Sequence, residues 1–312
     1  IEMMEVELIA SLAGHQNPVY TVEASQKAGI LFTAGNDKGV VEWSIMRAEF
    51  IKVLMPIQSS SYALHASAAA PILAVGERNG HVSLFNFEEQ KVAAVLEHHK
   101  KPIFDIKSVL SKKELLVASE DGTVSVWDLN YKAAGEDSPK LLFHFTVSTE
   151  MVRAISISPD ERTVAFGCKD NRIRIYSLED YSPLHDFEAH TLPVSSLEYS
   201  PDGKYLISGS RDAQLNIWNT TDYSLFKTIP AHLFAIYSIA WHPSKPFFAT
   251  SSRDKTIKIW DDNFELKKTL SVDKGYPMHR LSVNKIIWEP NNGYLISVSD
   301  DKLLKIWNIT GF

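Results

Sequence analysis

The feature of this 312-residue chain that most constrains its fold is a seven-fold repeat kept in register. A large aromatic residue marks each repeat, and these are Trp43, Phe85, Trp127, Tyr176, Trp218, Trp260 and Trp307. Their intervals are 42, 42, 49, 42, 42 and 47 residues. Such a period is typical of units that cannot bury their own apolar face and must stack on a neighbour. We therefore expect one stacked array over residues 1–312, although length alone suggests about two domains.

Two further residue types share this register. An acid or amide lies six residues before each aromatic, at Asp37, Asn79, Asp121, Asp170, Asp212, Asp254 and Asp301. Twenty-eight residues before each aromatic, the chain has His15, Ile57, His99, Ser148, His190, His232 and His279. Because these three positions recur in one register, each residue of a repeat can be compared with the residue at the same position in the other repeats.

The fifth repeat shows the structure of one unit most clearly. Residues 194–200 and 205–210 are short apolar-rich segments, and Pro201-Asp202-Gly203 between them is a turn sequence. Residues 214–218 alternate polar and apolar side chains, as a half-buried strand does, and residues 223–229 supply a fourth strand. Each unit therefore predicts a four-stranded antiparallel meander. Seven such units predict an all-β, seven-bladed β-propeller.

The chain ends predict how the ring closes. The last aromatic, Trp307, is followed by only five residues, so the final repeat lacks its fourth strand. Residues 5–12 read as a strand that belongs to no repeat. We expect this strand to complete blade seven, because an open ring would expose strand edges. Residues 1–3 are interpreted as an added remnant before a natural start at Met4. Residues 1–5 lack the basic region of a signal peptide.

Several dipeptides carry a resemblance to a known family. Trp127-Asp128, Trp260-Asp261, Gly14-His15, Ala189-His190 and Ala231-His232 resemble the WD40 repeat family over roughly residues 5–309. The resemblance implies a buried hydrogen-bond network of His, Ser or Thr, Asp and Trp within a blade. The expected full networks are His15-Thr33-Asp37-Trp43, His190-Ser208-Asp212-Trp218, His232-Thr250-Asp254-Trp260 and His279-Ser297-Asp301-Trp307. Blade three has Val117 where the hydroxyl is expected, which predicts a shortened network. Blades two and four are expected to lack it.

The same residue types could suggest chemistry. A Ser-His-Asp set is the pattern of a catalytic triad, but a set that recurs four times in register favours a structural role. The repeat histidines lie one per blade, and adjacent His98 and His99 should point to opposite faces, so no metal site is expected. The single cysteine, Cys168, permits no intramolecular disulfide and is interpreted as a small buried hydrophobe. No cofactor is predicted.

The resemblance also implies that a partner peptide binds at the top face and channel mouth. Four aromatics and several basic residues occupy top-face positions of the register. The predicted partner-binding residues are Tyr20, Tyr62, Phe104, Arg153, Tyr237, Arg78, Lys169, Arg211, Arg253 and Phe234. Aromatic and arginine side chains dominate interface hot spots, and the basic residues favour an acidic or phosphorylated segment with an apolar anchor. The alternative is that the arginines only solvate the surface.

These observations predict a non-enzymatic protein-interaction scaffold. A propeller enzyme with a channel site is the first alternative, although Asp105 and Glu198 are judged isolated and away from the mouth. A basic-face nucleic-acid binder is the second, disfavoured by the net charge of −6. No apolar run is long enough to span a membrane, and a monomeric, cytoplasmic ring is expected. Insertions at 131–140 and 272–277 interrupt the period, and Tyr276 in the second could rim the site.

Overall fold

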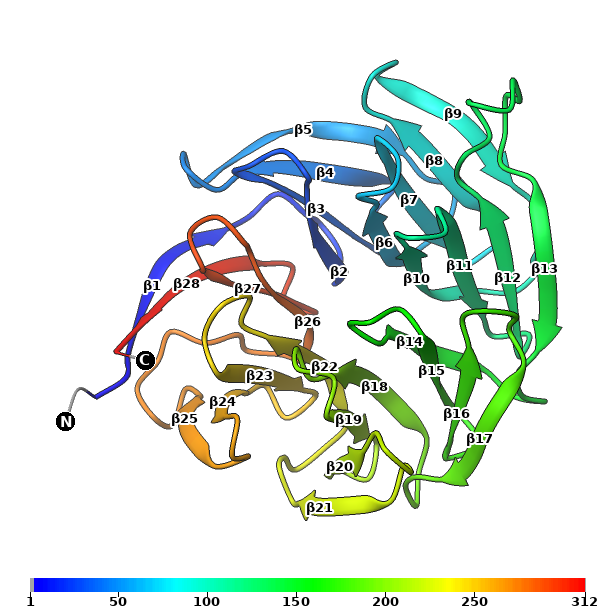
Figure 1. Cartoon of the computed structure of the whole chain (residues 1–312). Helices are drawn as coiled ribbons and strands as arrows, with labels where there is room; N and C mark the ends of the chain where they lie inside the picture. Colours follow the sequence, from blue (N-terminus) through cyan, green and yellow to red (C-terminus); the bar gives the residue numbers. More distant parts are fainter. Residues whose placement is uncertain (1–2, 312) are drawn as a thin grey trace.

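Seven antiparallel sheets stand side by side around a central axis in the computed structural model, which describes residues 3–311 (Figure 1). Residues 1 and 2 of the interpreted N-terminal remnant lie outside the described residues. Each sheet has four strands, and consecutive strands pair with one another. The all-β, seven-bladed propeller expected from the repeat is therefore confirmed.

The strands of the first four blades follow the chain order. Blade 1 contains β2 (Val19–Ala24), β3 (Ile30–Gly35), β4 (Gly39–Ser44) and β5 (Glu49–Pro56). Blade 2 contains β6 (Ser61–Ala66), β7 (Ile72–Glu77), β8 (Val82–Asn86) and β9 (Lys91–Leu96). Blade 3 contains β10 (Ile103–Val109), β11 (Glu114–Ser119), β12 (Thr123–Asp128) and β13 (Leu141–Thr146). Blade 4 contains β14 (Val152–Ile157), β15 (Thr163–Cys168), β16 (Arg172–Ser177) and β17 (Pro183–Glu188).

The last three blades include the one that joins the chain ends. Blade 5 contains β18 (Val194–Tyr199), β19 (Tyr205–Ser210), β20 (Leu215–Asn219) and β21 (Leu225–Ile229). Blade 6 contains β22 (Ile236–Trp241), β23 (Phe247–Ser252), β24 (Ile257–Asp261) and β25 (Leu266–Leu270). Blade 7 contains β26 (Val283–Trp288), β27 (Leu295–Ser299), β28 (Leu304–Thr310) and, as its outermost strand, β1 (Glu5–Leu12).

The N-terminal strand closes the ring as expected. β1 pairs antiparallel with β28, from Glu5 opposite Thr310 to Leu12 opposite Leu304. Its alternate residues are partly buried, and Val6 and Leu8 pack against the core that contains Trp307. The first and last strands of the chain thus lie side by side (Figure 1).

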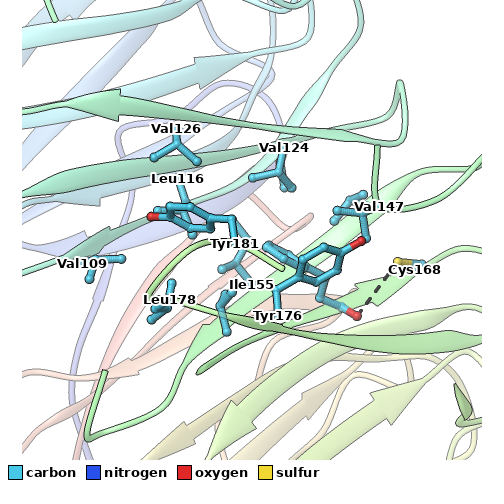
Figure 2. Close-up of a cluster of buried hydrophobic side chains, with 14 residues drawn as sticks. Val109, Leu116, Val124, Val126, Val147, Ile155, Cys168, Tyr176, Leu178 and Tyr181 are labelled. Atoms are coloured by element: carbon cyan, nitrogen blue, oxygen red, sulfur yellow. Dashed lines mark hydrogen bonds between the residues drawn. The ribbon is translucent and has the colours of Figure 1, made fainter. Parts of the chain in front are cut away.

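Apolar side chains fill the space between neighbouring blades. Figure 2 shows one such cluster, in which Leu116 and Val126 of blade 3 meet Ile155 and Tyr176 of blade 4. Cys168 is fully buried in this cluster, and burial raises the pKa of its thiol to about 12. The thiol therefore stays protonated and unreactive near neutral pH, because the thiolate is the nucleophilic form.

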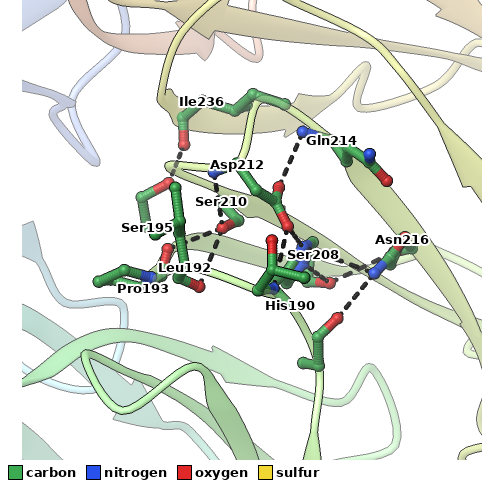
Figure 3. A network of polar contacts seen from close by, with 12 residues as sticks. His190, Leu192, Pro193, Ser195, Ser208, Ser210, Asp212, Gln214, Asn216 and Ile236 are labelled. Atoms are coloured by element: carbon green, nitrogen blue, oxygen red, sulfur yellow. Dashed lines mark hydrogen bonds and ion pairs between the residues drawn. The ribbon is translucent and has the colours of Figure 1, made fainter.

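The four expected networks are each joined by hydrogen bonds within a blade. In blade 5, the His190 ring lies 2.9 Å from Asp212 through Nδ1 and 2.7 Å from the Ser208 hydroxyl through Nε2 (Figure 3). The Trp218 indole N–H donates to the same hydroxyl at 2.9 Å. Blades 1, 6 and 7 have the same pattern, with every corresponding distance between 2.6 and 3.0 Å.

The expectation of a shortened network in blade 3 is wrong. His99 Nδ1 lies 2.7 Å from Asp121, and His99 Nε2 lies 2.8 Å from the Ser125 hydroxyl. The Trp127 indole N–H donates to Ser125 at 2.9 Å. Ser125 is on the third strand, opposite Val117 on the second. A neighbouring strand therefore delivers the hydroxyl to the same place between the two rings.

Blades 2 and 4 lack the histidine network, and each satisfies its polar groups differently. In blade 4, the Arg174 guanidinium makes two hydrogen bonds to Asp170, at 3.0 and 2.7 Å, and the Ser148 hydroxyl donates to the same carboxylate. In blade 2, Ile57 is buried where the histidine would stand. There the Glu77 carboxylate accepts the backbone N–H groups of residues 58 and 59.

Removal of the latch strand tests the closure. Deletion of residues 1–12 should lower the melting temperature of the whole ring, because it opens a gap and strips apolar cover from Trp307. Differential scanning calorimetry of the full and shortened chains makes the comparison. An unchanged melting temperature would show that β1 contributes nothing to closure.

The corrected network of blade 3 gives a second prediction. Ser125→Ala should reduce the free energy of unfolding by about 1–3 kcal/mol, because His99 and Trp127 both lose their buried partner. Ser83→Ala is the matched control, since Ser83 holds the same position in blade 2, where no histidine stands. Urea unfolding measures the free energy of unfolding of both variants. Equal losses would contradict a specific role for Ser125.

The buried histidines predict loss of stability in acid. Burial lowers the pKa of His15, His232 and His279 below the ordinary value of 6.5, although their Asp partners oppose the shift. The unfolded chain then binds more protons, so the stability present above about pH 6.5 is lost as the pH falls. Glu198 has the opposite effect on the free energy of unfolding: burial raises its pKa to about 7, so its contribution to stability grows as the pH falls.

We therefore expect the Glu198→Gln variant to have a smaller free energy of unfolding at about pH 5 than at about pH 7. Urea titrations at the two pH values measure the difference. Equal or greater stability at the lower pH would contradict neutral buried histidines.

Candidate functional site

A β-bulge in every blade presents the side chains of the channel mouth. In each blade, the pairing of the first and second strands shifts by one residue near the start of the first strand. The residue skipped is Tyr20, Tyr62, Phe104, Arg153, Ser195, Tyr237 or Asn284. A bulge leaves one residue out of the ladder and re-aims its side chain. These seven positions can therefore vary without loss of regular pairing.

Four of the mouth residues form a continuous stack over blades 1 to 4. The rings of Tyr20 and Tyr62 are stacked with centroids 5.0 Å apart, and those of Tyr62 and Phe104 are 5.1 Å apart. The Arg153 guanidinium lies over the Phe104 ring, 5.1 Å from its centroid. Three of the four aromatics therefore stabilise the propeller itself, because stacking and cation–π contacts are favourable without a bound partner.

Two further mouth residues tie blades together. The Ser195 hydroxyl of blade 5 donates to the Ile236 carbonyl of blade 6 (Figure 3). The Asn284 amide of blade 7 donates to the Val19 carbonyl of blade 1 at 2.8 Å, across the ring closure. Among residues 3–311, Tyr237 is the one mouth residue that makes no hydrogen bond or ring contact with a neighbour.

A pocket of about 220 Å³ opens on the top face beside Tyr237. We call it the basic pocket. Its lining comprises Phe104, Met151, Arg153, Lys169, Pro193, Val194, Ser195, Arg211 and Tyr237. Its charged side chains are all cationic and come from blades 4 and 5, while Met151, Pro193 and the two aromatics supply apolar walls. The structure thus gathers Phe104, Arg153, Lys169, Arg211 and Tyr237 of the predicted site.

The cations of the basic pocket are available for a ligand. The ion pairs of Arg and Lys in the described part of the chain are made by Arg47, Lys107, Lys112, Lys132, Arg172, Arg174 and Lys267. Lys169 and Arg211 are exposed and belong to none of these pairs. The protein is acidic overall, so the exposed Lys169 and Arg211, with Arg153 on the same wall, form a local site for an anion.

Exposed apolar side chains continue from the pocket across blades 5 to 7. Leu192, Leu233, Phe234 and Leu281 lie in the loops that lead into the innermost strands, and their exposed fractions are 47%, 81%, 53% and 47%. We call this set the apolar arc. Arg253 lies over the Phe234 ring, 5.8 Å from its centroid. A run of exposed leucine and phenylalanine in one arc is typical of an interaction surface.

Five predicted site residues lie outside the basic pocket, and two of them, Tyr20 and Tyr62, belong to the ring stack over blades 1 to 4. Arg78 is exposed on blade 2, and its charge acts on the Tyr20 hydroxyl. Phe234 belongs to the apolar arc, and Arg253 lies over its ring. The insertion at 272–277 places Tyr276 against the apolar core around Met278 and Trp307, so its ring is partly buried there. The insertion at 131–140 connects β12 to β13 at the outer edge of blade 3.

The channel below the mouth is charged, which the sequence reading missed. It holds a cavity of about 550 Å³ whose wall includes Glu23, His65, Asp105, Lys107, Glu198 and Lys285. Asp105 and Glu198 were expected to be isolated, and this is wrong. Lys107 lies 3.5 Å from Asp105, and the fields of Lys107 and Lys285 reach Glu198. These wall residues lie six or eight positions after the histidine position of their repeats, which is Ile57 in the second repeat.

One channel contact resembles a catalytic arrangement. His65 Nδ1 lies 3.5 Å from Glu23, and its Nε2 lies 2.6 Å from the Ser108 hydroxyl. That hydroxyl donates to Ser67, and Ser108 is absent from the channel lining, so the contact serves to join blades 1, 2 and 3. Within residues 3–311, no three His, Cys, Asp or Glu side chains are grouped as metal ligands. The same residues include no helix long and apolar enough to cross a membrane.

Comparison with curated proteins gives partial matches. The chain is 25% identical over 173 residues to Protein SPA1-RELATED 3 of Arabidopsis thaliana, which covers 54% of this chain and 20% of that protein. It is 26% identical over 194 residues to U3 small nucleolar RNA-associated protein 12 of Saccharomyces cerevisiae, covering 58% and 20%. COMPASS component SWD3 of the same yeast is 29% identical over 130 residues, covering 39% and 41%. The matched stretches thus span less than half of these relatives.

Two family descriptions match the chain itself. Residues 111–199 match the anaphase-promoting complex subunit 4 WD40 domain. The description "WD domain, G-beta repeat" matches residues 6–44, 90–128, 181–219, 223–261 and 270–308. These five segments contain the five aromatics whose indole donates to a network hydroxyl, and they exclude Phe85 and Tyr176. Together they cover more than half of the chain, which therefore belongs to the WD40 repeat family.

Proposed function

We propose that this protein is an interaction scaffold that captures a segment of a partner protein on its top face. WD40 propellers typically bind proteins or peptides, and one relative is named as a component of a larger assembly. The observation that carries the proposal is the basic pocket, which has three cations, no acid in its lining and an unpartnered Tyr237 on its wall. The polar residues that could suggest catalysis are engaged in the blade networks.

The chemistry of the surface indicates the bound segment. Arg153, Lys169 and Arg211 can surround a carboxylate or a phosphoryl group, which charge-assisted hydrogen bonds from arginine recognise well. The apolar arc beside them can hold one or two large apolar side chains of the same segment. We therefore propose an acidic or phosphorylated peptide with an apolar anchor, bound across blades 4 to 6. A monomeric ring and a cytoplasmic location remain predictions.

Charge reversal tests the basic pocket. An array of peptides that combine phosphoserine or glutamate with leucine or phenylalanine serves as the probe. The Lys169→Glu/Arg211→Glu double variant should bind the retained peptides at least about tenfold more weakly, because each charge-assisted contact contributes about 1.5–3 kcal/mol. Fluorescence anisotropy measures the affinities. Phosphatase treatment of the array separates phosphorylated from simply acidic ligands.

Arg162→Glu/Lys204→Glu is the matched control. Arg162 and Lys204 are exposed on the same two blades, just before β15 and β19, at the opposite end of the ring. The control has the same net charge as the test variant and should keep its affinity. Leu233→Ser/Phe234→Ser should weaken the same peptides through the arc. Undiminished binding by the Lys169/Arg211 variant would overturn the proposal. An equal loss of affinity in both charge variants would also contradict it, because long-range attraction rather than contact with the pocket would then explain the effect.

A further inference from the structure

Two acids of the channel, Glu23 and Asp105, are held by backbone N–H groups and by a charged or titratable neighbour. The Glu23 carboxylate accepts the backbone N–H groups of Ala24 and Ala66 and lies beside His65. The Asp105 carboxylate accepts the N–H groups of Ile106 and Ile155 and pairs with Lys107. These two acids are therefore fully engaged by the protein.

Glu198 and Lys285 have no such partners. Neither side chain makes a hydrogen bond or an ion pair within 4.0 Å to another residue of the described chain, although each feels the field of the opposite charges across the channel, and both line the channel cavity. Burial raises the pKa of Glu198 to about 7 and lowers that of Lys285, so each is short of compensation for its charge. A buried charge without a partner is costly, which makes both groups candidates to receive a ligand.

The geometry leaves room between them. Glu198 is on the innermost strand of blade 5, Lys285 is on that of blade 7, and blade 6 separates the two. The channel-lining residues of blade 6 at the same two levels are Ser238 and Ala240, which are both small. A recess thus lies between an acid on one side and an ammonium on the other. The cavity volume of about 550 Å³ falls within the usual range of small-molecule sites.

The signs of the charges select the ligand. A simple anion would meet Lys285 but also the fixed carboxylates of Glu23 and Asp105. A simple cation would meet Glu198 but also the ammonium groups of Lys107 and Lys285 and the guanidinium of Arg153. We propose that the channel binds a small zwitterion of the α-amino acid class, with its ammonium on Glu198 and its carboxylate on Lys285. This site is separate from the proposed peptide site on the top face.

The test uses the twenty common amino acids as probes on the intact protein. Thermal shift and saturation-transfer NMR should identify a stabilising member, and isothermal titration gives its dissociation constant. The corresponding amide, which lacks the carboxylate, and the N-acetyl derivative, which lacks the ammonium, should each bind at least about tenfold more weakly. Glu198→Gln and Lys285→Met should each weaken the parent amino acid by a similar factor.

Matched controls make the same chemical changes on the outer strands. Glu188→Gln and Lys227→Met alter exposed residues of β17 and β21 and should leave binding unchanged. Ala240→Leu keeps both charges and fills the recess, so it should block binding if a charge variant fails to fold. No binding by any amino acid below about 10 mM, or undiminished binding in Glu198→Gln and Lys285→Met, would overturn the proposal and indicate a channel filled by water. Neither result would affect the peptide site, which the Lys169/Arg211 variant tests.

The pH dependence gives an independent readout. The ligand ammonium needs the ionised form of Glu198, so affinity should rise between about pH 6 and pH 8. The other titratable or charged groups on the wall of this cavity are Tyr20, Glu23, Tyr62, His65, Asp105, Lys107, Arg153, Tyr237 and Lys285. Glu198→Gln should abolish the dependence if Glu198 is responsible. A dependence of equal size in that variant would assign it to another group and contradict the proposed contact.

Discussion

The pairing of β1 with β28 is the interaction on which the rest of the structure depends. The basic pocket takes its lining from blades 3 to 6, and the channel takes its charged groups and its histidine from blades 1, 2, 3, 4, 5 and 7. No single blade contains either site. The groups converge only because the ring is closed, and Asn284 reinforces the closure with a bond from blade 7 to blade 1. Loss of the latch would therefore disperse the sites as well as loosen one edge.

Each blade network needs a hydrogen-bonding group at a fixed place beside the repeat acid or the repeat aromatic, and different residues can supply that group. In blades 1, 5, 6 and 7 the hydroxyl comes from the second strand, while in blade 3 Ser125 brings it from the third. In blade 4, Arg174 occupies the place of the histidine in holding the repeat acid. A buried polar group is costly when unpaired, so a change at one position is tolerated when another restores the bond.

The sequence was sufficient to predict the ring, because the repeat places turn residues and alternating strands at fixed intervals. It also leaves one strand over at the N-terminus and one strand missing from the last repeat. Five of the ten residues assigned to the top face line one pocket, and their role in binding stays a prediction. The sequence did not predict that Tyr20, Tyr62 and Phe104 stack on one another, since no pattern within one repeat reports contacts between blades. The charges of the channel were missed for the same reason. Glu23, Lys107 and Lys285 lie in different repeats, and only the closed ring makes them neighbours.

The seven bulge residues of the mouth divide into structural and available positions. Tyr20, Tyr62, Phe104 and Arg153 cover the side of blades 1 to 4 with stacked rings, and Ser195 and Asn284 are used in bonds between blades. Tyr237 is left over, at the wall of the basic pocket and next to the apolar arc. A ring with seven similar units thus has one sector, blades 4 to 6, in which Tyr237, the exposed Lys169 and Arg211, and exposed apolar side chains of the arc are found together. An interaction surface requires this asymmetry, because seven equivalent sectors would give a partner no unique orientation.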